Sequence, residues 1–479
     1  MLFRMLYDEK LAQASYLIGC QRTGEALVVD PERDARRYLD LAAKEGLRVT
    51  AIAETHIHAD FLSGARELAE KTGARLYLSD EGNAEWKYFW LDEKHGGWKY
   101  DYQLLRDGDR FTIGKIELQA LHTPGHTPEH LSFLVTDRGG GADAPMGILT
   151  GDFVFAGDVG RPDLLETAAG QIGAAREAAA TLYHSLQRFN ALPDYLQVWP
   201  GHGSGSFCGK ALGSVLQSTV GYEKLYNASL LAAHKSEAAF VEDILEGQME
   251  PPLYFSRMKH ENKYGPKILG EVPQPRPLTA PELLARASDD SAVIDTRSWK
   301  NFCAGHLPRA LHIPLTNDFP TLAGSYLTPE QKIYLIVDHE RLQEAVLDLI
   351  RVGLDNIAGY LTPKDLTDSA NAPCFVPFLE ITAERLQQHI QQRDVQIIDV
   401  RTAFEYELGH LPGAINVAHT RLLAHMHKLP RERPLVVHCQ KADRSPAAAA
   451  MLAQHGFQVY HLAGGLRSWY AAGYETTLD

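Results

Sequence analysis

Apolar residues near the start of the chain form short strand-like runs that are separated by a helix-like segment. Two apolar runs, 14–19 and 26–31, predict strands joined by a turn around Thr23. The segment 34–45 predicts a helix, and the next apolar run, 49–53, predicts a buried strand. This alternation of strand, helix and strand is typical of a layered α/β fold.

Histidine and aspartate residues gather in four loops, each of which follows a strand-like segment. The first loop, 55–60, has a His-x-His-x-Asp sequence, and the later loops span 122–127, 150–152 and 200–203. A single residue of this kind is better explained as a surface or core residue. Four loops in order predict a metal site, because such loops meet at one edge of a layered sheet and supply the ligand types of zinc or non-heme iron. The candidates are His56, His58, Asp60, His126, Asp152 and His202.

The composition indicates a globular protein of several domains. A chain of 479 residues with 45% hydrophobic residues predicts about three domains. The net charge of -14 argues against nucleic-acid binding. The first residues carry charges too early for a signal peptide, and no apolar run reaches the roughly 20 residues that span a bilayer. The five cysteines are scattered, which favours reduced thiols. We therefore expect a cytoplasmic protein without a membrane or nucleic-acid partner.

The second half of the chain contains an internal repeat. The strand-like segment 293–297 matches 397–401, and the Gly-His-Leu-Pro segment 305–308 matches 409–412. The two copies therefore predict two domains of the same fold.

Only the second copy carries a candidate nucleophile. Its apolar run 434–438 leads into Cys439 and Arg444 at the start of an alanine-rich helix. Backbone N–H groups at a helix N-terminus and a nearby guanidinium stabilise a thiolate or persulfide anion. The first copy has His339 in the place of Cys439 and is shorter. We expect it to be catalytically inactive and to serve as a spacer, a docking surface or an oligomer contact.

These motifs resemble two known families. The four loops resemble the metallo-beta-lactamase fold, in the branch of hydroxyacylglutathione hydrolases and persulfide dioxygenases, and the repeat resembles the rhodanese sulfurtransferases. The resemblance implies an N-terminal αββα sandwich followed by two rhodanese-like α/β domains. The expected domains are the metallo-beta-lactamase fold at 1–245, a linker at 246–276, a degenerate rhodanese-like domain at 277–368 and an active rhodanese domain at 375–479.

The resemblance also implies a ligand set. In the persulfide dioxygenase branch, the residues matching His56, His126 and Asp152 bind one ferrous iron. Dinuclear hydrolases of the fold have a further histidine where this chain has Phe61, which cannot bind a metal. We therefore expect one Fe(II) per chain, with zinc as the alternative. The expected supporting residues are His58, Asp60, His202, Arg161 and Asp163, and for His58 a ligand role stays open. Cys208 is either a sulfur carrier or a packing residue.

The implied function is the oxidation of a small thiol persulfide, such as glutathione persulfide, by dioxygen to sulfite and thiol. Sulfur transfer at Cys439, with Arg444 closing its loop, would then make or use thiosulfate during sulfide detoxification. The resemblance also suggests a homo-oligomer. The main alternative is a zinc thioester hydrolase of the hydroxyacylglutathione type with an appended sulfurtransferase. A third alternative is a sulfur carrier or sensor whose first domain only binds metal.

Two further segments allow two interpretations each. The aromatic run 85–102, which includes Trp86 and Trp98, either walls a substrate pocket or packs the edge of the sandwich. The segment 246–276 is expected to be a linker, although its cationic residues Arg257, Lys259 and Lys263 could reach an anionic thiol cofactor if the segment folds back over the first domain.

Overall fold

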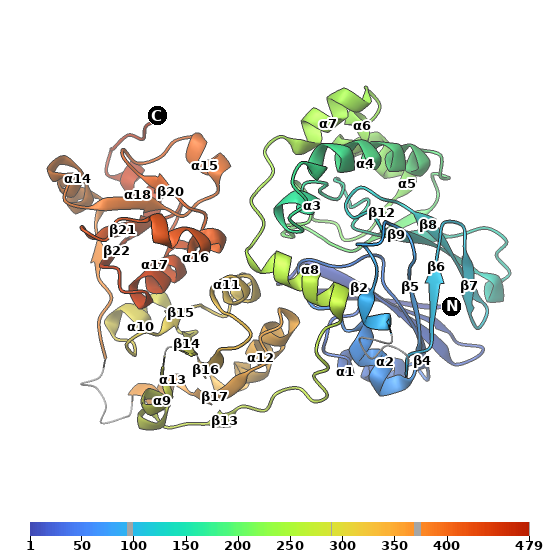
Figure 1. The fold of residues 1–479 in the computed structure, drawn as a ribbon, viewed down its shortest axis with the longest axis horizontal. Coiled ribbons are helices and arrows are strands. Elements are labelled where there is room, and N and C mark those ends of the chain that lie inside the picture. The colour runs from blue at the N-terminus through green and yellow to red at the C-terminus, as the bar shows by residue number, and fades with distance from the viewer. Residues whose placement is uncertain (93–98, 289, 368–374, 479) are drawn as a thin grey trace. The chain divides into compact units, whose positions relative to one another are not determined.

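A computed structural model describes residues 1–92, 99–288, 290–367 and 375–478. Trp98 and Cys374 lie outside the described residues. The chain forms two compact units. The first contains Met1–Gly270 with Ile350–Val352, and the second contains Glu271–Leu349 with Gly353–Asp479. Figure 1 shows the elements of both units.

Two six-stranded sheets form the centre of the first unit. The first sheet has the order β1-β2-β3-β4-β5-β6 and the second the order β12-β11-β10-β9-β8-β7. The expected strands at 14–19, 26–31 and 49–53 are confirmed as β2, β3 and β4. The bounds are β1 Leu2–Asp8, β2 Gln13–Cys20, β3 Glu25–Val29, β4 Arg48–Ala53, β5 Arg75–Ser79, β6 Tyr102–Leu105, β7 Arg110–Ile113, β8 Ile116–His122, β9 Leu131–Asp137, β10 Gly147–Gly151, β11 Gln197–Pro200 and β12 Ser218–Thr219.

Helices cover the outer faces of both sheets. On β2, Leu17 lies in the cluster that packs against helices α1 and α2, whereas its neighbour Ile18 lies in the cluster between the sheets. A third cluster joins the second sheet to α4 and α7. These three apolar layers confirm the expected αββα sandwich. The helices are α1 Arg36–Lys44, α2 Ala65–Thr72, α3 Leu164–Thr167, α4 Ala174–Asn190, α5 Val220–Tyr226, α6 Ala228–Ala232, α7 Glu237–Leu245 and α8 Tyr254–Tyr264.

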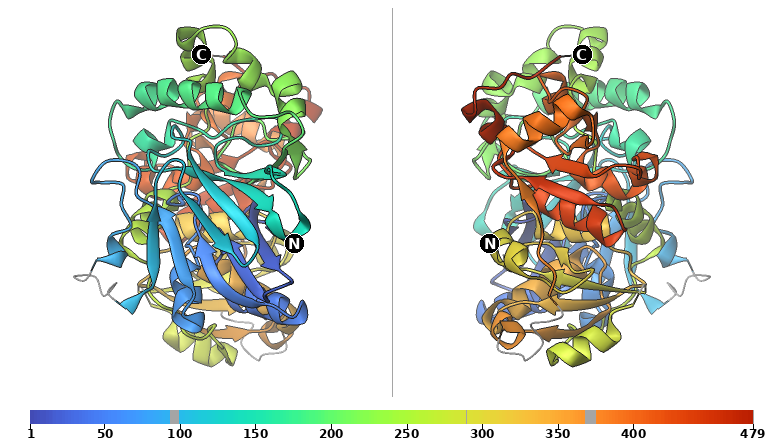
Figure 2. Two further views of the ribbon diagram at one scale, coloured as in Figure 1. Left: turned by 90° about the vertical axis from the view of Figure 1, so that its right-hand side faces the viewer. Right: turned by 90° about the vertical axis from the view of Figure 1, so that its left-hand side faces the viewer.

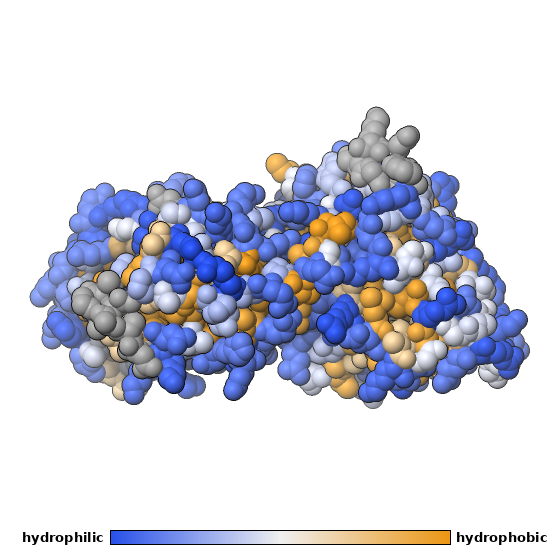
Figure 3. Space-filling model, turned by 90° about the horizontal axis from the view of Figure 1, so that it is seen from below, coloured by the Kyte–Doolittle hydropathy of each residue, from blue (hydrophilic) through white to orange (hydrophobic). Residues whose placement is uncertain are grey.

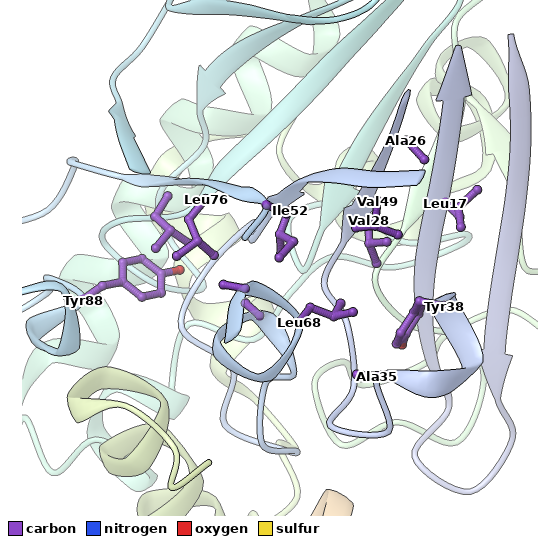
Figure 4. Packing of buried hydrophobic residues seen from close by; sticks show 14 of the residues in the cluster. Leu17, Ala26, Val28, Ala35, Tyr38, Val49, Ile52, Leu68, Leu76 and Tyr88 are labelled. Atoms are coloured by element: carbon purple, nitrogen blue, oxygen red, sulfur yellow. The ribbon is translucent and has the colours of Figure 1, made fainter. Parts of the chain in front are cut away.

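The outer layer of the first sheet can be followed in Figure 4. Val28 and Ile52 extend from the strands toward Tyr38 of α1 and Leu68 of α2, and all four side chains are fully buried. Figure 2 shows the blue strands of the first sheet and the cyan strands of the second within this unit. The packing of α1 and α2 on the first sheet fixes the position of its strands, and therefore the edge of the sandwich at which the polar loops begin.

Helix α8 lies inside the segment 246–276 that the sequence predicts as a linker. Phe255 and Met258 of this helix are buried. The amide of Asn262 donates hydrogen bonds to the backbone oxygens of His58, at 2.9 Å, and Phe61, at 2.8 Å. The helix therefore packs on the first His-containing loop, and the compact unit continues to Gly270.

The second unit contains two five-stranded parallel sheets with the same topology. Their orders are β13-β17-β16-β14-β15 and β18-β22-β21-β19-β20, so each strand has a counterpart in the other sheet. This confirms the internal repeat. The bounds are β13 Arg276–Pro277, β14 Ser291–Asp295, β15 Leu311–His312, β16 Lys332–Ile336, β17 Ile357–Leu361, β18 Glu380–Ile381, β19 Gln396–Asp399, β20 Ile415–Asn416, β21 Leu435–His438 and β22 Val459–Leu462.

Short helices surround these two sheets. They are α9 Ala280–Arg286, α10 Trp299–Ala304, α11 Phe319–Tyr326, α12 Leu342–Arg351, α13 Pro363–Thr367, α14 Ala383–Gln392, α15 Ala403–Glu407, α16 Leu422–His425, α17 Ser445–Gln454 and α18 Gly465–Ala471. The face shown in Figure 3 is mainly hydrophilic, and its apolar patches are interrupted by polar residues. Among the described residues, no helix has the length and apolarity that a membrane crossing requires.

Candidate functional site

The four polar loops of the first unit begin where strands end. His56 and His58 follow β4, His126 follows β8, Asp152 follows β10, and His202 follows β11. Because the carboxyl ends of these strands lie at one edge of the sandwich, residues far apart in the sequence converge there.

Three of these residues could hold a metal ion. Ligand atoms of His56, His126 and Asp152 lie within 4.8 Å of one another, and all three side chains are buried. Asp152 Oδ2 is 3.8 Å from His56 Nε2 and 3.6 Å from His126 Nε2. Neither carboxylate oxygen of Asp152 has a hydrogen-bond partner within the described ranges. Since buried acceptors without partners are costly, this donor set fits a cation bound between the three side chains.

Hydrogen bonds fix the orientation of both imidazoles. The hydroxyl of Thr55 donates to Asp30 at 2.9 Å, so it accepts from Nδ1 of His56 at the same distance. Nδ1 of His126 lies 3.1 Å from the carbonyl oxygen of Arg161, which can only accept. Both Nδ1 atoms therefore carry the proton, and both Nε2 lone pairs face Asp152. This arrangement is typical of histidine ligands to metals.

A second group of donors lies beside the first. Asp60, His202 and Cys208 also have ligand atoms within 4.8 Å of one another. His202 Nε2 is 3.3 Å from Asp60 Oδ2 and 3.5 Å from Asp152 Oδ2, and neither Asp60 oxygen has a hydrogen-bond partner in the part of the chain that the structure describes. Burial raises the pKa of Asp152 to about 6, with the carboxylate of Asp60 acting in the same direction. Bound cationic charge would oppose both effects.

His58 and Phe61 lie at the edge of this donor set. His58 Nε2 is 3.2 Å from Asp30 Oδ1, and His58 is absent from both donor groups. Burial disfavours the imidazolium form, but the carboxylate of Asp30 outweighs it and raises the pKa of His58 to about 9. This fits a supporting role, although Nδ1 has no partner among the described residues. Phe61 is fully buried, with its ring centroid 4.5 Å from that of His58.

Arg161 connects the site to the loop of Cys208. Its guanidinium donates to both carboxylate oxygens of Asp163, at 3.0 and 2.6 Å, and to the backbone oxygen of Phe207 at 3.0 Å. Its own backbone N–H donates to the carbonyl oxygen of Cys208 at 3.1 Å. Burial, together with the carboxylates of Asp152 and Asp60, raises the pKa of the Cys208 thiol well above its usual value, which keeps it protonated.

The fold adds one residue whose role the sequence left conditional. Lys259 of α8 is 4% exposed, and its Nζ has no hydrogen-bond partner among the residues that the structure describes. Nζ lies 4.9 Å from the ring centroid of Trp86. Burial lowers the pKa of Lys259, while the carboxylates of Glu129 and Asp152 act in the opposite direction. Lys259 is therefore a buried amine whose charged form is favoured by the carboxylates of the acidic site.

The aromatic run both packs and lines a cavity. Trp86, Tyr88 and Trp90 belong to the buried cluster of the first sheet. Trp86 also lines a cavity of about 350 Å³ together with Pro124 and Leu165. The packing interpretation is therefore confirmed for these three residues, and a substrate-binding role of the cavity stays a prediction.

Cys439 lies in a tight loop between β21 and α17. Its Sγ is 3.4 Å from the backbone nitrogen of Ser445, 3.3 Å from the hydroxyl of the same residue, and 3.3 Å from Asp443 Oδ1. The N-terminus of α18 binds this loop, because the backbone N–H of Leu466 donates a hydrogen bond to the backbone oxygen of Cys439 at 2.9 Å. Gly465 allows this approach: a Cβ there would lie 2.5 Å from the same oxygen, at a φ of +61°.

Arg444 closes the loop through a residue that sequence reasoning missed. Its guanidinium forms two hydrogen bonds with Glu405, at 2.6 and 2.7 Å. Burial alone would raise the pKa of Glu405, but hydrogen bonds and charge from Arg444 lower it to about 2. The sequence signal for Glu405 is its capping box with Thr402 at the start of α15, which indicates a helix start and not a loop partner.

The first repeat lacks this arrangement. His339 stands where Cys439 stands in the second repeat, and its Nδ1 lies 2.9 Å from the hydroxyl of Tyr360. Cys303 belongs to α10 and lies outside the equivalent loop.

Comparisons with known proteins agree with this architecture. The family descriptions that match are "Metallo-beta-lactamase superfamily" at residues 9–202 and "Rhodanese-like domain" at 279–362 and 382–472. A crystal structure titled metallo-beta-lactamase, from Staphylococcus aureus, is 40% identical with a TM-score of 0.67, and the match covers 76% of this chain and 99% of that chain.

Two curated relatives bear on activity. A mitochondrial persulfide dioxygenase ETHE1 of Bos taurus is 26% identical, over 42% of this chain and 68% of its own length. A hydroxyacylglutathione hydrolase of Rhodospirillum rubrum is 29% identical, over 39% of this chain and 60% of its own length. The chain spans only 46% to 61% of the length of several curated relatives that it matches.

Proposed function

Because this chain belongs to the metallo-beta-lactamase superfamily in its N-terminal domain and carries two rhodanese-like domains, we propose that it oxidises a thiol persulfide with dioxygen and transfers sulfur at Cys439. The observation that carries the proposal is the buried group of His56, His126 and Asp152, in which Asp152 has no hydrogen-bond partner within the described ranges. Two imidazoles and one carboxylate on one side of a metal are typical of non-heme iron oxygenases.

The chain's own residues hold and orient the metal. His56 and His126 would bind through Nε2, since Nδ1 of each is engaged in a hydrogen bond. Ferrous iron, when bound, would supply open positions at which a persulfide sulfur and dioxygen meet. Phe61 supports single occupancy, because its buried ring removes a ligand from the second position.

Lys259 would recognise the anionic substrate. A persulfide is an anion at neutral pH, and the charged form of Lys259 is already favoured by the carboxylates of Glu129, Asp152 and Asp60. A buried cation with no hydrogen-bond partner among the described residues offsets the charge of an entering anion and donates to it. The Trp86 ring, 4.9 Å from Nζ, favours the charged form of this buried ammonium group.

The two reactions balance separately. In the first, R–S–S⁻ + O2 + H2O gives R–SH + HSO3⁻, so the terminal sulfur is oxidised and dioxygen is reduced. In the second, the Cys439 thiolate attacks the outer sulfur of a persulfide R–S–SH, the S–S bond of the donor breaks, and the leaving R–S⁻ takes the proton. The products are Cys–S–S⁻ and R–SH. Sulfite then attacks that sulfur, the S–S bond breaks, thiosulfate leaves and the thiolate is restored. Because both domains belong to one chain, sulfite made in the first would have a higher effective concentration at Cys439.

The alternative is a zinc thioester hydrolase with an appended sulfurtransferase. The observation that favours it is the second donor group of Asp60, His202 and Cys208, which lies next to Asp152 and offers ligand types that zinc accepts. The hydrolase relative supports the same alternative. A metal in this position would activate water for attack on a thioester.

Paired variants test the proposal. His126→Ala should abolish oxygen uptake with glutathione persulfide and leave thiosulfate:cyanide sulfur transfer unchanged, whereas Cys439→Ser should do the reverse. Cleavage of hydroxyacylglutathione without oxygen uptake by the unmodified protein would overturn the dioxygenase proposal. Loss of neither activity in the two variants would support a carrier or sensor instead.

A further inference from the structure

A chain of hydrogen bonds leads from Cys439 to a buried histidine of the same repeat. The hydroxyl of Ser445 is 3.3 Å from Cys439 Sγ and 2.9 Å from His461 Nε2. His461 and Ser445 are both fully buried. On its other side, Nδ1 of His461 is 3.0 Å from Glu380 Oε1. Four side chains from three parts of the second repeat are thus connected in series.

The far end of this chain fixes the direction of the bonds. The indole N–H of Trp299 donates to the same Glu380 oxygen at 2.9 Å. The hydrogen bond with His461 is the largest cause that lowers the pKa of Glu380, so this group is a carboxylate and accepts from Nδ1. Nε2 of the neutral His461 imidazole therefore accepts the hydrogen bond from the Ser445 hydroxyl. Once the imidazole is protonated, Nε2 donates a hydrogen bond to the Ser445 oxygen instead.

We propose that Ser445, His461 and Glu380 form a proton relay that takes the thiol proton from Cys439. This inference rests on the proposed sulfur transfer at Cys439. The S–H proton passes to the Ser445 oxygen as the hydroxyl proton passes to His461 Nε2. The products are a thiolate and an imidazolium that is paired with Glu380. The Ser445 hydroxyl, which now carries the former thiol proton, donates a hydrogen bond to the thiolate. Reprotonation of the sulfur follows the same steps in reverse. No electrons are exchanged.

The repeat without a nucleophile contributes to this relay. Trp299 belongs to α10 of the first repeat, and its ring lies edge-to-face on the His461 imidazole at a centroid distance of 5.0 Å. Its N–H orients Glu380, and its ring restricts the imidazole. Trp299 is therefore a positioning residue. The degenerate repeat would serve the active one by completing the environment of His461, in addition to any role as a spacer.

Other titratable groups face the same atoms. Asp443 Oδ1 accepts from the Cys439 thiol at 3.3 Å and therefore competes with the Ser445 hydroxyl for the thiol proton. Lys441 pairs with Asp443 at 3.3 Å. Asp443 is the more exposed competitor, with 42% of its side chain accessible, and it has no connection to His461. Further charged or titratable groups among the described residues interact with the thiol, His461, Glu380 or Asp443; they include Arg444, Asp318, His312, His419, His438 and Cys303.

The test is the pH dependence of Cys439 reactivity in the full chain. The rate of alkylation by iodoacetamide is followed on the Cys439 peptide by mass spectrometry, alongside thiosulfate:cyanide sulfur transfer. In His461→Gln and Ser445→Ala, the pH of half-maximal alkylation should rise by about one unit, which corresponds to about tenfold slower reaction at neutral pH. Trp299→Phe keeps the ring and removes the N–H, so a smaller shift of the same sign is expected. Ser445→Thr should restore the original profile.

The controls separate the relay from its alternatives. Asp443→Asn tests the competing acceptor. Ser445→Ala removes only a hydroxyl group, so it still tests the relay if the larger change in His461→Gln disturbs folding. Unchanged profiles in Ser445→Ala and His461→Gln, or a shift produced by Asp443→Asn alone, would overturn the relay. Absence of sulfur transfer in the unmodified protein would instead remove the proposed reaction, while the alkylation profiles still report on the relay.

Discussion

Replacing Lys259 with methionine should stabilise the protein and weaken substrate binding at the same time. Lys259 is 4% exposed and its Nζ has no hydrogen-bond partner among the described residues, so Lys259→Met breaks no hydrogen bond that the structure describes and keeps most of the buried volume. A buried ion without a hydrogen-bond partner costs several kcal/mol, and replacing it with an apolar residue is expected to return about 1 to 3 kcal/mol. The melting temperature should rise by a few degrees.

The same change removes the charge that meets the persulfide. A hydrogen bond to a charged group contributes about 1.5 to 3 kcal/mol. Its loss corresponds to an increase in KM of about tenfold to one hundredfold, since about 1.4 kcal/mol equals a factor of ten. The assay is oxygen uptake at varied glutathione persulfide concentration, together with a thermal scan of the same sample.

Lys263→Met is the matched control. Lys263 lies on the same helix, is partly exposed, and has its Nζ 5.3 Å from the ring centroid of Phe89. The control should change neither KM nor melting temperature appreciably. A lower melting temperature for Lys259→Met, or an unchanged KM, would refute the assigned role of the buried cation.

Three further predictions concern single residues. Phe61→His should increase the metal content measured by elemental analysis from one to two ions per chain, because it restores a donor beside the second group; an unchanged metal content would contradict this. Gly465→Ala should lower the melting temperature and abolish sulfur transfer while oxygen uptake persists, since a Cβ would lie 2.5 Å from the Cys439 oxygen; retained sulfur transfer would oppose this view. The pKa of Glu405 is lowered to about 2 in the folded protein, whereas a glutamate in the unfolded chain has a pKa of about 4.3. The stabilisation by its pair with Arg444 is therefore fully present above about pH 4.3 and is lost as the pH falls toward 2. Glu405→Gln should remove this part of the acid dependence in a pH series of denaturation curves, and an unchanged dependence would exclude it.

The first strands and the loops that carry the donors could be predicted because both depend on local sequence, whereas the choice of three donors among six candidates came from the family resemblance. His56, His126 and Asp152 each follow an apolar strand within a few residues, and strands of one sandwich end at a common edge. The helix that begins after Cys439 and Arg444 was visible for the same reason, and it is α17. The layered architecture follows from alternation along strands such as β2.

Residues that act across the fold could not be predicted in this way. Lys259 lies in a segment with no clear period, and only the packing of α8 on the first His-containing loop brings it to the site. The series from Cys439 to His461 and Glu380 joins a loop to two separate strands, and Trp299 comes from the other repeat. Hydrogen bonds between such distant positions leave no local pattern in the sequence.

The most direct test of the central claim combines metal analysis with oxygen uptake on one purified sample. The account predicts one iron per chain and one dioxygen consumed for each sulfite formed from glutathione persulfide, with no cleavage of a hydroxyacylglutathione thioester. Two zinc ions per chain, thioester cleavage and no oxygen uptake would contradict it.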